Sequence, residues 1–200
     1  MSTLSSGAHP VWFRATRVVC LLTLLALAGC ASSGPSPSSA SRPPGKAAGL
    51  PDSVLVDDGQ GRTFPLHVSA VVGGGALISG FGARRHAMGG EGGSHQGIDI
   101  AAPLGAPVRA AAPGTIVELG WHGGYGRFVR IRHADHLETA YAHLSRFGKD
   151  LKLGSRVNQD EVIGYVGTSG HSTGPHLHYE IRRNGKPIDP LRLPRAGGAV

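Results

Sequence analysis

Two histidines, His176 and His178, stand two positions apart in the segment PHLHYEI at 175–181. Apolar and polar residues alternate along this segment, and a strand points alternate side chains to opposite faces. Both imidazoles and Glu180 would then share one polar face, with the two rings roughly 7 Å apart. That spacing lets one ring bind a metal ion while the other stands beside a bound water. Taken alone, the pair also fits an exposed strand with solvated histidines.

A second pair, His95 and Asp99, lies four positions apart in the segment SHQGIDIA at 94–101. Gly97 and the two β-branched isoleucines make a helix unfavourable here. In a straight strand the two side chains would be roughly 13 Å apart, too far to share a metal ion at about 2 Å. A bend at Gly97 would bring them together. In the alternative, His95 lies in a loop and Asp99 caps a turn.

A third histidine, His143, ends the strand-like segment TAYAHL at 139–144. Period-two alternation predicts that His143 shares a face with Tyr141. A single histidine at a strand end is also compatible with a purely structural role, so this residue gains interest only in combination with the other two groups.

Two imidazoles and one carboxylate are a chemically complete ligand set for a catalytic zinc ion. Three protein ligands leave one of the four tetrahedral positions for water, whereas a structural zinc usually has four protein ligands, with cysteines among them. The only cysteines are Cys20 and Cys30, which excludes a cysteine-based metal site and a disulfide framework from the rest of the chain. The remaining histidines would be available for acid–base chemistry near neutral pH.

Three motifs resemble those of the LytM/lysostaphin-type peptidoglycan metalloendopeptidases: HQGIDIA at 95–101, YAHLS at 141–145 and GPHLHYEI at 174–181. The resemblance covers about residues 76–190, and the motifs stand in family order. It implies an all-β fold, an antiparallel sandwich or barrel-like LytM domain (a duplicated hybrid motif), with one zinc ion (Zn²⁺) bound in an open groove.

The resemblance also implies a role for each matching position. It makes His95, Asp99 and His178 the zinc ligands, and His143 and His176 the catalytic histidines. The implied activity is that of a zinc endopeptidase which hydrolyses the peptide cross-links of bacterial peptidoglycan. Some relatives that lack metal ligands instead activate separate peptidoglycan amidases, so an amidase is the alternative partner; here no ligand is missing, which favours the enzyme. A weaker third possibility is a passive wall-binding lipoprotein.

The elements that would position these residues are short strands. Gly accounts for 32 of the 200 residues, charged residues for only 16%, and no segment shows helical periodicity over three turns. Gly and Pro separate short apolar runs at close intervals, as in a sandwich or barrel. The expected strands are Ala76–Ser79, Gly97–Ala101, Pro107–Ala111, Thr115–Leu119, Phe128–Arg132, Glu138–His143, Val162–Val166 and His176–Arg183.

Flanking segments are predicted more coarsely. Residues 51–75 form a β-rich lead-in, with a hairpin around the Asp58-Gly59 turn and a possible strand at Leu66–Val72. Residues 191–200 are expected to be a loose tail. His171 either lines the substrate groove or is solvated. The other histidines are expected on the surface or in turns: His67, His122, His133 and His136.

The N-terminus has the features of an export signal. Arg14 and Arg17 precede an apolar run at Val18–Ala28, which as a helix would span about 16 Å, well short of a hydrocarbon core of about 30 Å. A short membrane anchor or a buried helix is the alternative. The run ends in LAGC at 27–30, which resembles the lipobox of bacterial lipoproteins. This resemblance implies that residues 1–29 are a signal peptide and that Cys30 is lipidated and anchors the chain to a membrane.

Residues 30–50 follow as the lipidated cysteine and a linker rich in Ser, Pro and Gly, which has little to bury and is expected to be disordered. The predicted location is the cell envelope, at the outer membrane facing the periplasm in a Gram-negative cell, because Ala31 provides no retention signal. The net charge of +7 is not concentrated in a Lys/Arg cluster, so nucleic acid is not a predicted partner.

Overall fold

The computed structural model describes residues 49–85 and 91–196, and their regular structure consists of fourteen strands and one 3₁₀ turn. All strand pairings are antiparallel, so the all-β prediction is confirmed. The elements are β1 (Val54–Asp57), β2 (Thr63–Leu66), β3 (Ala76–Ser79), β4 (Gly82–Arg85), β5 (Glu91–His95), β6 (Ile98–Ala101), β7 (Pro107–Arg109), β8 (Gly114–Trp121), η1 (Gly123–Tyr125), β9 (Arg127–Ala134), β10 (Leu137–Phe147), β11 (Arg156–Val157), β12 (Val162–Val166), β13 (His176–Arg183) and β14 (Lys186–Ile188).

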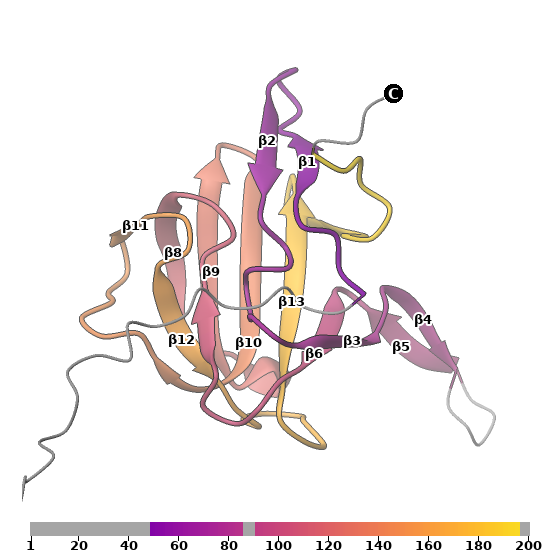
Figure 1. Cartoon of the computed structure of the whole chain (residues 1–200), viewed down its shortest axis with the longest axis vertical. Helices are drawn as coiled ribbons and strands as arrows, with labels where there is room; N and C mark the ends of the chain where they lie inside the picture. The colour runs from indigo at the N-terminus through magenta and orange to yellow at the C-terminus, as the bar shows by residue number, and fades with distance from the viewer. Residues whose placement is uncertain (1–48, 86–90, 197–200) are drawn as a thin grey trace, which may run out of the picture. The chain divides into compact units, whose positions relative to one another are not determined.

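Ten of the strands form one sheet (Figure 1), in which the main path runs β11-β8-β9-β10-β13-β6-β3. β12 pairs with both β10 and β7, and β14 pairs with β13. β1–β2 and β4–β5 are separate hairpins. All eight strands expected between residues 76 and 183 are present, whereas β4, β5, β11 and β14 were not anticipated.

The core follows from the alternation seen in the sequence. On β13, Leu177, Tyr179 and Ile181 are fully buried on one face, and Ile98 and Ile100 of β6 pack into the same core. Burying each such side chain stabilises the fold by about 1.5–3 kcal/mol. The opposite face of β13 is thereby left for its polar residues.

β10 is the strand that bends. Its first part pairs with β9 and β13, and its last part, from Leu144 onward, pairs with β12. His143 stands between these two parts with φ of 59°, in the left-handed region that non-glycine residues rarely adopt. The strand therefore loses its two-residue alternation at His143.

The lead-in is partly as expected. The β1–β2 hairpin is confirmed, with Val54 opposite Leu66. The additional strand suggested at Leu66–Val72 is wrong, because β2 ends at Leu66 and the chain then turns through residues 68–74. The valines of this segment are nevertheless buried, because consecutive turns fold them onto the core.

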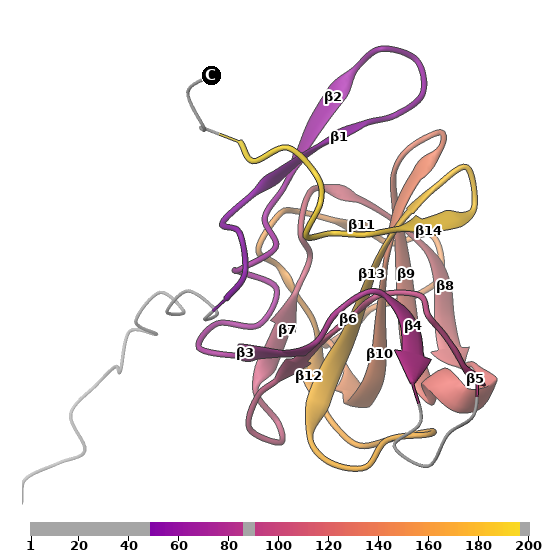
Figure 2. The ribbon, with the colours of Figure 1, turned by 90° about the vertical axis from the view of Figure 1, so that its right-hand side faces the viewer.

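Residues 194–196, which belong to the predicted loose tail at 191–200, run back along β1 (Figure 2). The backbone N–H of Leu55 donates to the carbonyl of Pro194 at 2.7 Å, and that of Ala196 donates to Ser53 at 3.0 Å. The views in Figures 1 and 2 agree that the β1–β2 hairpin lies at one end of the sheet and that β13 begins at the other.

Within the described ranges, no helix is both long and apolar enough to cross a membrane. The predicted signal peptide, Cys30 and all of the linker except residues 49–50 lie outside the described residues. Leu50 itself packs against the core.

One of the histidines expected at the surface, His133, belongs to a partly buried chain of hydrogen bonds. Its Nδ1–H donates to the carbonyl of Pro113 at 2.8 Å, and its Nε2 lies 2.7 Å from the hydroxyl of Thr139. That hydroxyl lies 2.9 Å from the phenol of Tyr141, which accepts the N–H of Ala111. Burial lowers the pKa of His133 from its ordinary value of 6.5 and so favours the neutral ring.

This network predicts a pH dependence of stability. Because the pKa of His133 is lower in the folded state, the unfolded chain binds more protons below pH 6.5, and the free energy of unfolding falls on acidification. The contribution of His133 is at most about 1.4 kcal/mol per pH unit. Urea unfolding at pH 7 and pH 5.5 should show a smaller loss for His133→Gln than for the wild type. Equal losses in the two proteins would contradict the assignment.

Candidate active site

Two neighbouring strands bring the first two donors together. β13 and β6 pair with His178 directly opposite Asp99, so both side chains project from the same face of the sheet. His178 and Asp99 are buried, with 5% and 6% of their surface exposed. The predicted polar face of β13 is thereby confirmed.

His95 reaches the same point because the chain bends at Gly97, as the sequence suggested. A Cβ at Gly97 would lie 2.3 Å from the carbonyl oxygen of Tyr179, so only glycine allows the bend to press against β13. His95 ends β5 and is itself buried. Its Nδ1–H donates to the carbonyl of Gly80 at 2.6 Å, which fixes the orientation of the ring.

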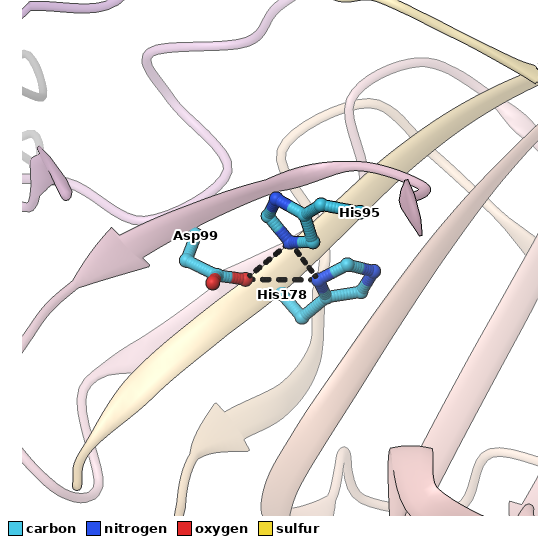
Figure 3. A group of neighbouring side chains, drawn as sticks. All are labelled: His95, Asp99 and His178. Carbon is cyan, nitrogen blue, oxygen red and sulfur yellow. Dashed lines mark hydrogen bonds and ion pairs between the residues drawn. The ribbon is translucent and has the colours of Figure 1, made fainter. Parts of the chain in front are cut away.

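Figure 3 shows the three side chains facing one another. His95 Nε2 lies 3.0 Å from Asp99 Oδ1 and 3.0 Å from His178 Nδ1, and the last two atoms are 2.9 Å apart. Ligands at about 2.0–2.1 Å from a tetrahedral metal ion would be roughly 3.3 Å apart. The three atoms are therefore close to the spacing that a single small cation requires.

The protonation pattern of the rings points to a cation as well. A neutral imidazole carries one N–H. In His95 that N–H is used on Gly80, and in His178 the Nε2–H donates to the carboxylate of Glu180 at 3.1 Å. The two nitrogens that face Asp99 consequently present lone pairs. Three lone pairs directed at one point are stabilised by a positive charge between them, which fits a metal ion.

The pKa values agree with this electrostatic picture. Burial alone would raise the pKa of Asp99, but hydrogen bonds with His178 and His95, which a proton on the facing ring nitrogens would provide in place of a metal ion, outweigh it and hold that pKa far below its usual range. Burial would lower the pKa of His178, but its hydrogen bonds with Asp99 and Glu180 raise it instead. The cluster thus favours positive charge beside a permanently ionised carboxylate.

The two remaining candidate histidines flank this cluster. The rings of His143 and His176 lie 4.7 Å apart, and the His143 ring lies 6.0 Å from that of His178. His176 Nε2 is 3.8 Å from Asp99 Oδ1. The structure therefore brings together all five positions expected from the sequence.

The expectation that His143 shares a face with Tyr141 is wrong. Tyr141 is fully buried in the core against Tyr179, whereas His143 lines the groove on the other side. The bend at His143 breaks the alternation on which the expectation depended. Backbone strain of this kind is often retained at functional sites.

A loop holds His143 in place. The Nδ1–H of His143 donates to the carbonyl of Ser169 at 2.8 Å, which leaves Nε2 as the acceptor of the neutral ring. The Ser169 hydroxyl donates to the carbonyl of Leu144 at 2.8 Å and accepts the N–H of Arg127 at 2.9 Å. Burial lowers the pKa of His143 to about 4, with neighbouring His176 acting in the same direction.

The loop that contains Ser169 and Gly170 lies against η1 and Gly126, which follows it. This close contact leads to a prediction for Gly170→Ala. Gly170 has φ of 72°, and a Cβ there would lie 2.4 Å from Gly124 O and from Gly126 N. We expect a loss of about 1–3 kcal/mol in stability from overpacking. Displacement of Ser169 and His143 should also reduce activity by up to about 10²-fold.

Gly174 provides the matched control for that substitution. It lies in the same loop, and a Cβ there would meet nothing within 4 Å. Gly174→Ala should therefore change the free energy of unfolding by less than about 0.5 kcal/mol. Thermal unfolding and peptidase rates for both variants test the comparison, and similar behaviour of the two would contradict the close contact with η1.

An open groove of about 580 Å³ surrounds the cluster. Besides the five candidate residues it is lined by Ile78, Gly93, Ser94, Gln96, Gly124, Tyr125, His171 and Thr173. His171, whose position the sequence left open, lies exposed in this lining, with its N–H donating to Gly124 O at 2.7 Å. Ile78 is 60% exposed and gives the groove an apolar patch.

Two residues with evident roles had been given none from the sequence. Glu180 was placed on the polar face of β13, but its complete burial beside His178 was not foreseen. Ser169 carried no signal, because a carbonyl that accepts from a distant histidine leaves no pattern in the local sequence.

An all-β domain with a buried His-Asp-His cluster in an open groove is the architecture of a metallopeptidase, and comparisons with known proteins agree. Residues 93–190 match the pattern of peptidase family M23. DD-carboxypeptidase/endopeptidase Mpg of Neisseria meningitidis is 53% identical over 117 residues, which are 58% of this chain and 26% of Mpg. The chain thus spans about a quarter of the curated relatives it matches.

Solved structures show the same relationship. The catalytic domain of the prophage-encoded M23 protein EnpA from Enterococcus faecalis, in a mutant form, is 38% identical, with a TM-score of 0.51 over 62% of this chain and 93% of that domain. A zinc-containing peptidase from Vibrio cholerae is 28% identical, with a TM-score of 0.59 over 72% of this chain and 47% of that protein. The chain belongs to peptidase family M23, and the LytM/lysostaphin-type resemblance is confirmed.

Proposed function

We propose that this protein is a lipid-anchored zinc metalloendopeptidase that hydrolyses peptide cross-links of bacterial peptidoglycan. The observation that supports the proposal most directly is the convergence of His95 Nε2, Asp99 Oδ1 and His178 Nδ1 within about 3 Å of one another in an open groove. The name of Mpg, a DD-carboxypeptidase/endopeptidase, supports the same class of reaction.

His95, Asp99 and His178 would hold the zinc ion. Their number and type are those of catalytic zinc sites, which leave one coordination position for water or substrate. When bound, zinc supplies Lewis acidity, which polarises a carbonyl oxygen and lowers the pKa of water from 15.7 towards about 7.

His143 and His176 would move the protons. The Nδ1–H of each ring donates to a backbone carbonyl, that of Ser169 and that of Gly174, so Nε2 is the nitrogen that can accept a proton when either ring is neutral. With a pKa of about 4, His143 is neutral at pH 7 and can accept a proton at Nε2. Once protonated, the ring can pass that proton to a leaving amine. Once protonated at Nε2, the two rings would also donate hydrogen bonds that stabilise an oxyanion.

The test uses defined cross-linked muropeptides and mass spectrometry of the fragments, with and without a chelator. Chelator-sensitive cleavage of a peptide bond, restored by added zinc, is the expected result. Zinc-loaded, folded protein that releases no fragment would overturn the proposal. Stimulation of peptidoglycan amidases by His178→Ala would instead favour the non-catalytic alternative.

Membrane anchoring rests on the sequence, in which LAGC at 27–30 closes a short apolar run. Acylation of Cys30 would place the domain in the cell envelope, with residues 31–50 as the tether. Mass spectrometry of the N-terminal peptide from membranes should find acyl chains on Cys30, and Cys30→Ala should be released into the soluble fraction. An unmodified Cys30 in protein purified from membranes would contradict the proposal that Cys30 is the lipid anchor.

A further inference from the structure

A buried carboxylate, Glu180, lies directly behind the metal-binding cluster. It follows His178 by two residues on β13, so the two side chains share a face, and Glu180 is completely buried. A charge in such a place is costly unless hydrogen bonds compensate for it. The hydrogen-bond donors around the Glu180 carboxylate therefore indicate the role of its negative charge.

Three donors surround this carboxylate. His178 Nε2–H donates to Oε1 at 3.1 Å, and the hydroxyl of Tyr125 donates to the same oxygen at 2.7 Å. Arg182 donates from Nη1 to Oε2 at 2.6 Å and from Nη2 to the carbonyl of Gly185 at 2.9 Å. The carboxylate is thus fixed on both oxygens, and the acceptor offered to His178 has a defined position.

The bond to His178 selects one tautomer. A ring that gives its proton to Glu180 from Nε2 has the lone pair on Nδ1, and Nδ1 is the atom that faces Asp99 and His95. A carboxylate acceptor also makes the ring a more basic metal ligand. Tyr125 connects this arrangement to the substrate groove, because its ring lines the groove and lies 5.5 Å from the His178 ring.

We propose that Glu180, held by Tyr125 and Arg182, is a positioning residue whose negative charge fixes the Nε2–H tautomer of His178 and sets the metal affinity of the site. The inference rests on the proposed function in taking zinc as the metal, but it does not depend on which bond the protein cleaves.

The decisive variant is Glu180→Gln in the full-length protein. It keeps the shape of the side chain and removes its charge, and its amide cannot satisfy His178, Tyr125 and Arg182 at once. Zinc affinity measured by competition with a chromophoric chelator should fall about 10- to 100-fold. An affinity within about twofold of the wild type, in a protein whose circular dichroism is unchanged, would overturn the proposal.

Glu138→Gln is the matched control. Glu138 lies on β10 opposite Arg182 and binds Arg130 at 3.5 Å and Arg132 at 3.2 Å. The substitution changes the charge of the same sheet face by the same amount, and the side chain of Glu138 contacts Arg130 and Arg132 rather than His178 in the part of the chain described here. Its zinc affinity should stay within about twofold of the wild type, because the predicted effect requires the bond to the ligand. Equal weakening by both substitutions would overturn the proposal.

A measurement on the unmodified protein keeps the test independent of how the variants fold. Long-range ¹⁵N–¹H spectra of the zinc-loaded protein should show His178 protonated at Nε2 and unprotonated at Nδ1, and the opposite tautomer would overturn the proposal. Zinc affinity and hydrolysis are separate readouts. A site whose affinity depends on Glu180 in a protein that cleaves no muropeptide would refute the proposed function and leave this inference standing.

Discussion

His178→Ala is expected to lose both bound zinc and peptide hydrolysis, with a fall in rate of at least about 10³-fold. His178 supplies one of the three donor atoms that converge in the described part of the chain, and the remaining two, His95 Nε2 and Asp99 Oδ1, would hold a divalent ion much less tightly. Zinc content after dialysis, measured by inductively coupled plasma mass spectrometry, and the rate of muropeptide cleavage test both parts.

His136→Ala is the control for this substitution, because His136 is exposed in the turn between β9 and β10 and does not line the groove. It should keep one zinc ion per chain and the wild-type rate. A His178→Ala protein that retained both stoichiometric zinc and a rate within tenfold of the wild type would show that the cluster is not the catalytic centre.

His143→Ala should lower the rate by about 10²–10⁴-fold while leaving zinc binding intact. His143 donates to Ser169 rather than to the cluster, and its ring lies 6.0 Å from that of His178, so its removal should cost proton transfer and not metal binding. Cleavage rates at saturating zinc, together with chelator competition, separate the two effects.

The comparison between His143→Ala and His178→Ala is the informative part of that experiment. Equal loss of zinc in both would place His143 among the ligands, against the geometry described here. A rate for His143→Ala close to the wild type would assign the proton transfers to His176 alone.

The resemblance to the LytM/lysostaphin-type family singled out the donor set, whereas the local sequence predicted only which side chains share a face and where the chain could bend. Alternation on β13 separates Leu177 and Tyr179 from His176 and His178, and strand geometry then fixes which side chains share a face. Gly97 indicated where the chain could bend to bring His95 to Asp99, because glycine tolerates the close approach of a neighbouring backbone.

The errors arose where structure depends on distant contacts. His143 faces away from Tyr141 because β10 changes partners there, which the TAYAHL segment does not reveal. The burial of Glu180 depends on Tyr125, which is 55 residues away. The β4–β5 hairpin was missed because its Gly-rich second strand lacks the apolar alternation that marks the other strands.

The pairing of residues 194–196 with β1 has a mechanical consequence. β1 has β2 on one side and residues 194–196 in backbone contact on the other, so separating β1 from the domain requires several hydrogen bonds to break at once. The groove is lined by His176 and His178, near the start of β13, and β13 begins at the opposite end of the sheet from the β1–β2 hairpin (Figure 2). A force applied at β1 would therefore have to break these hydrogen bonds at the far end of the sheet from the histidines.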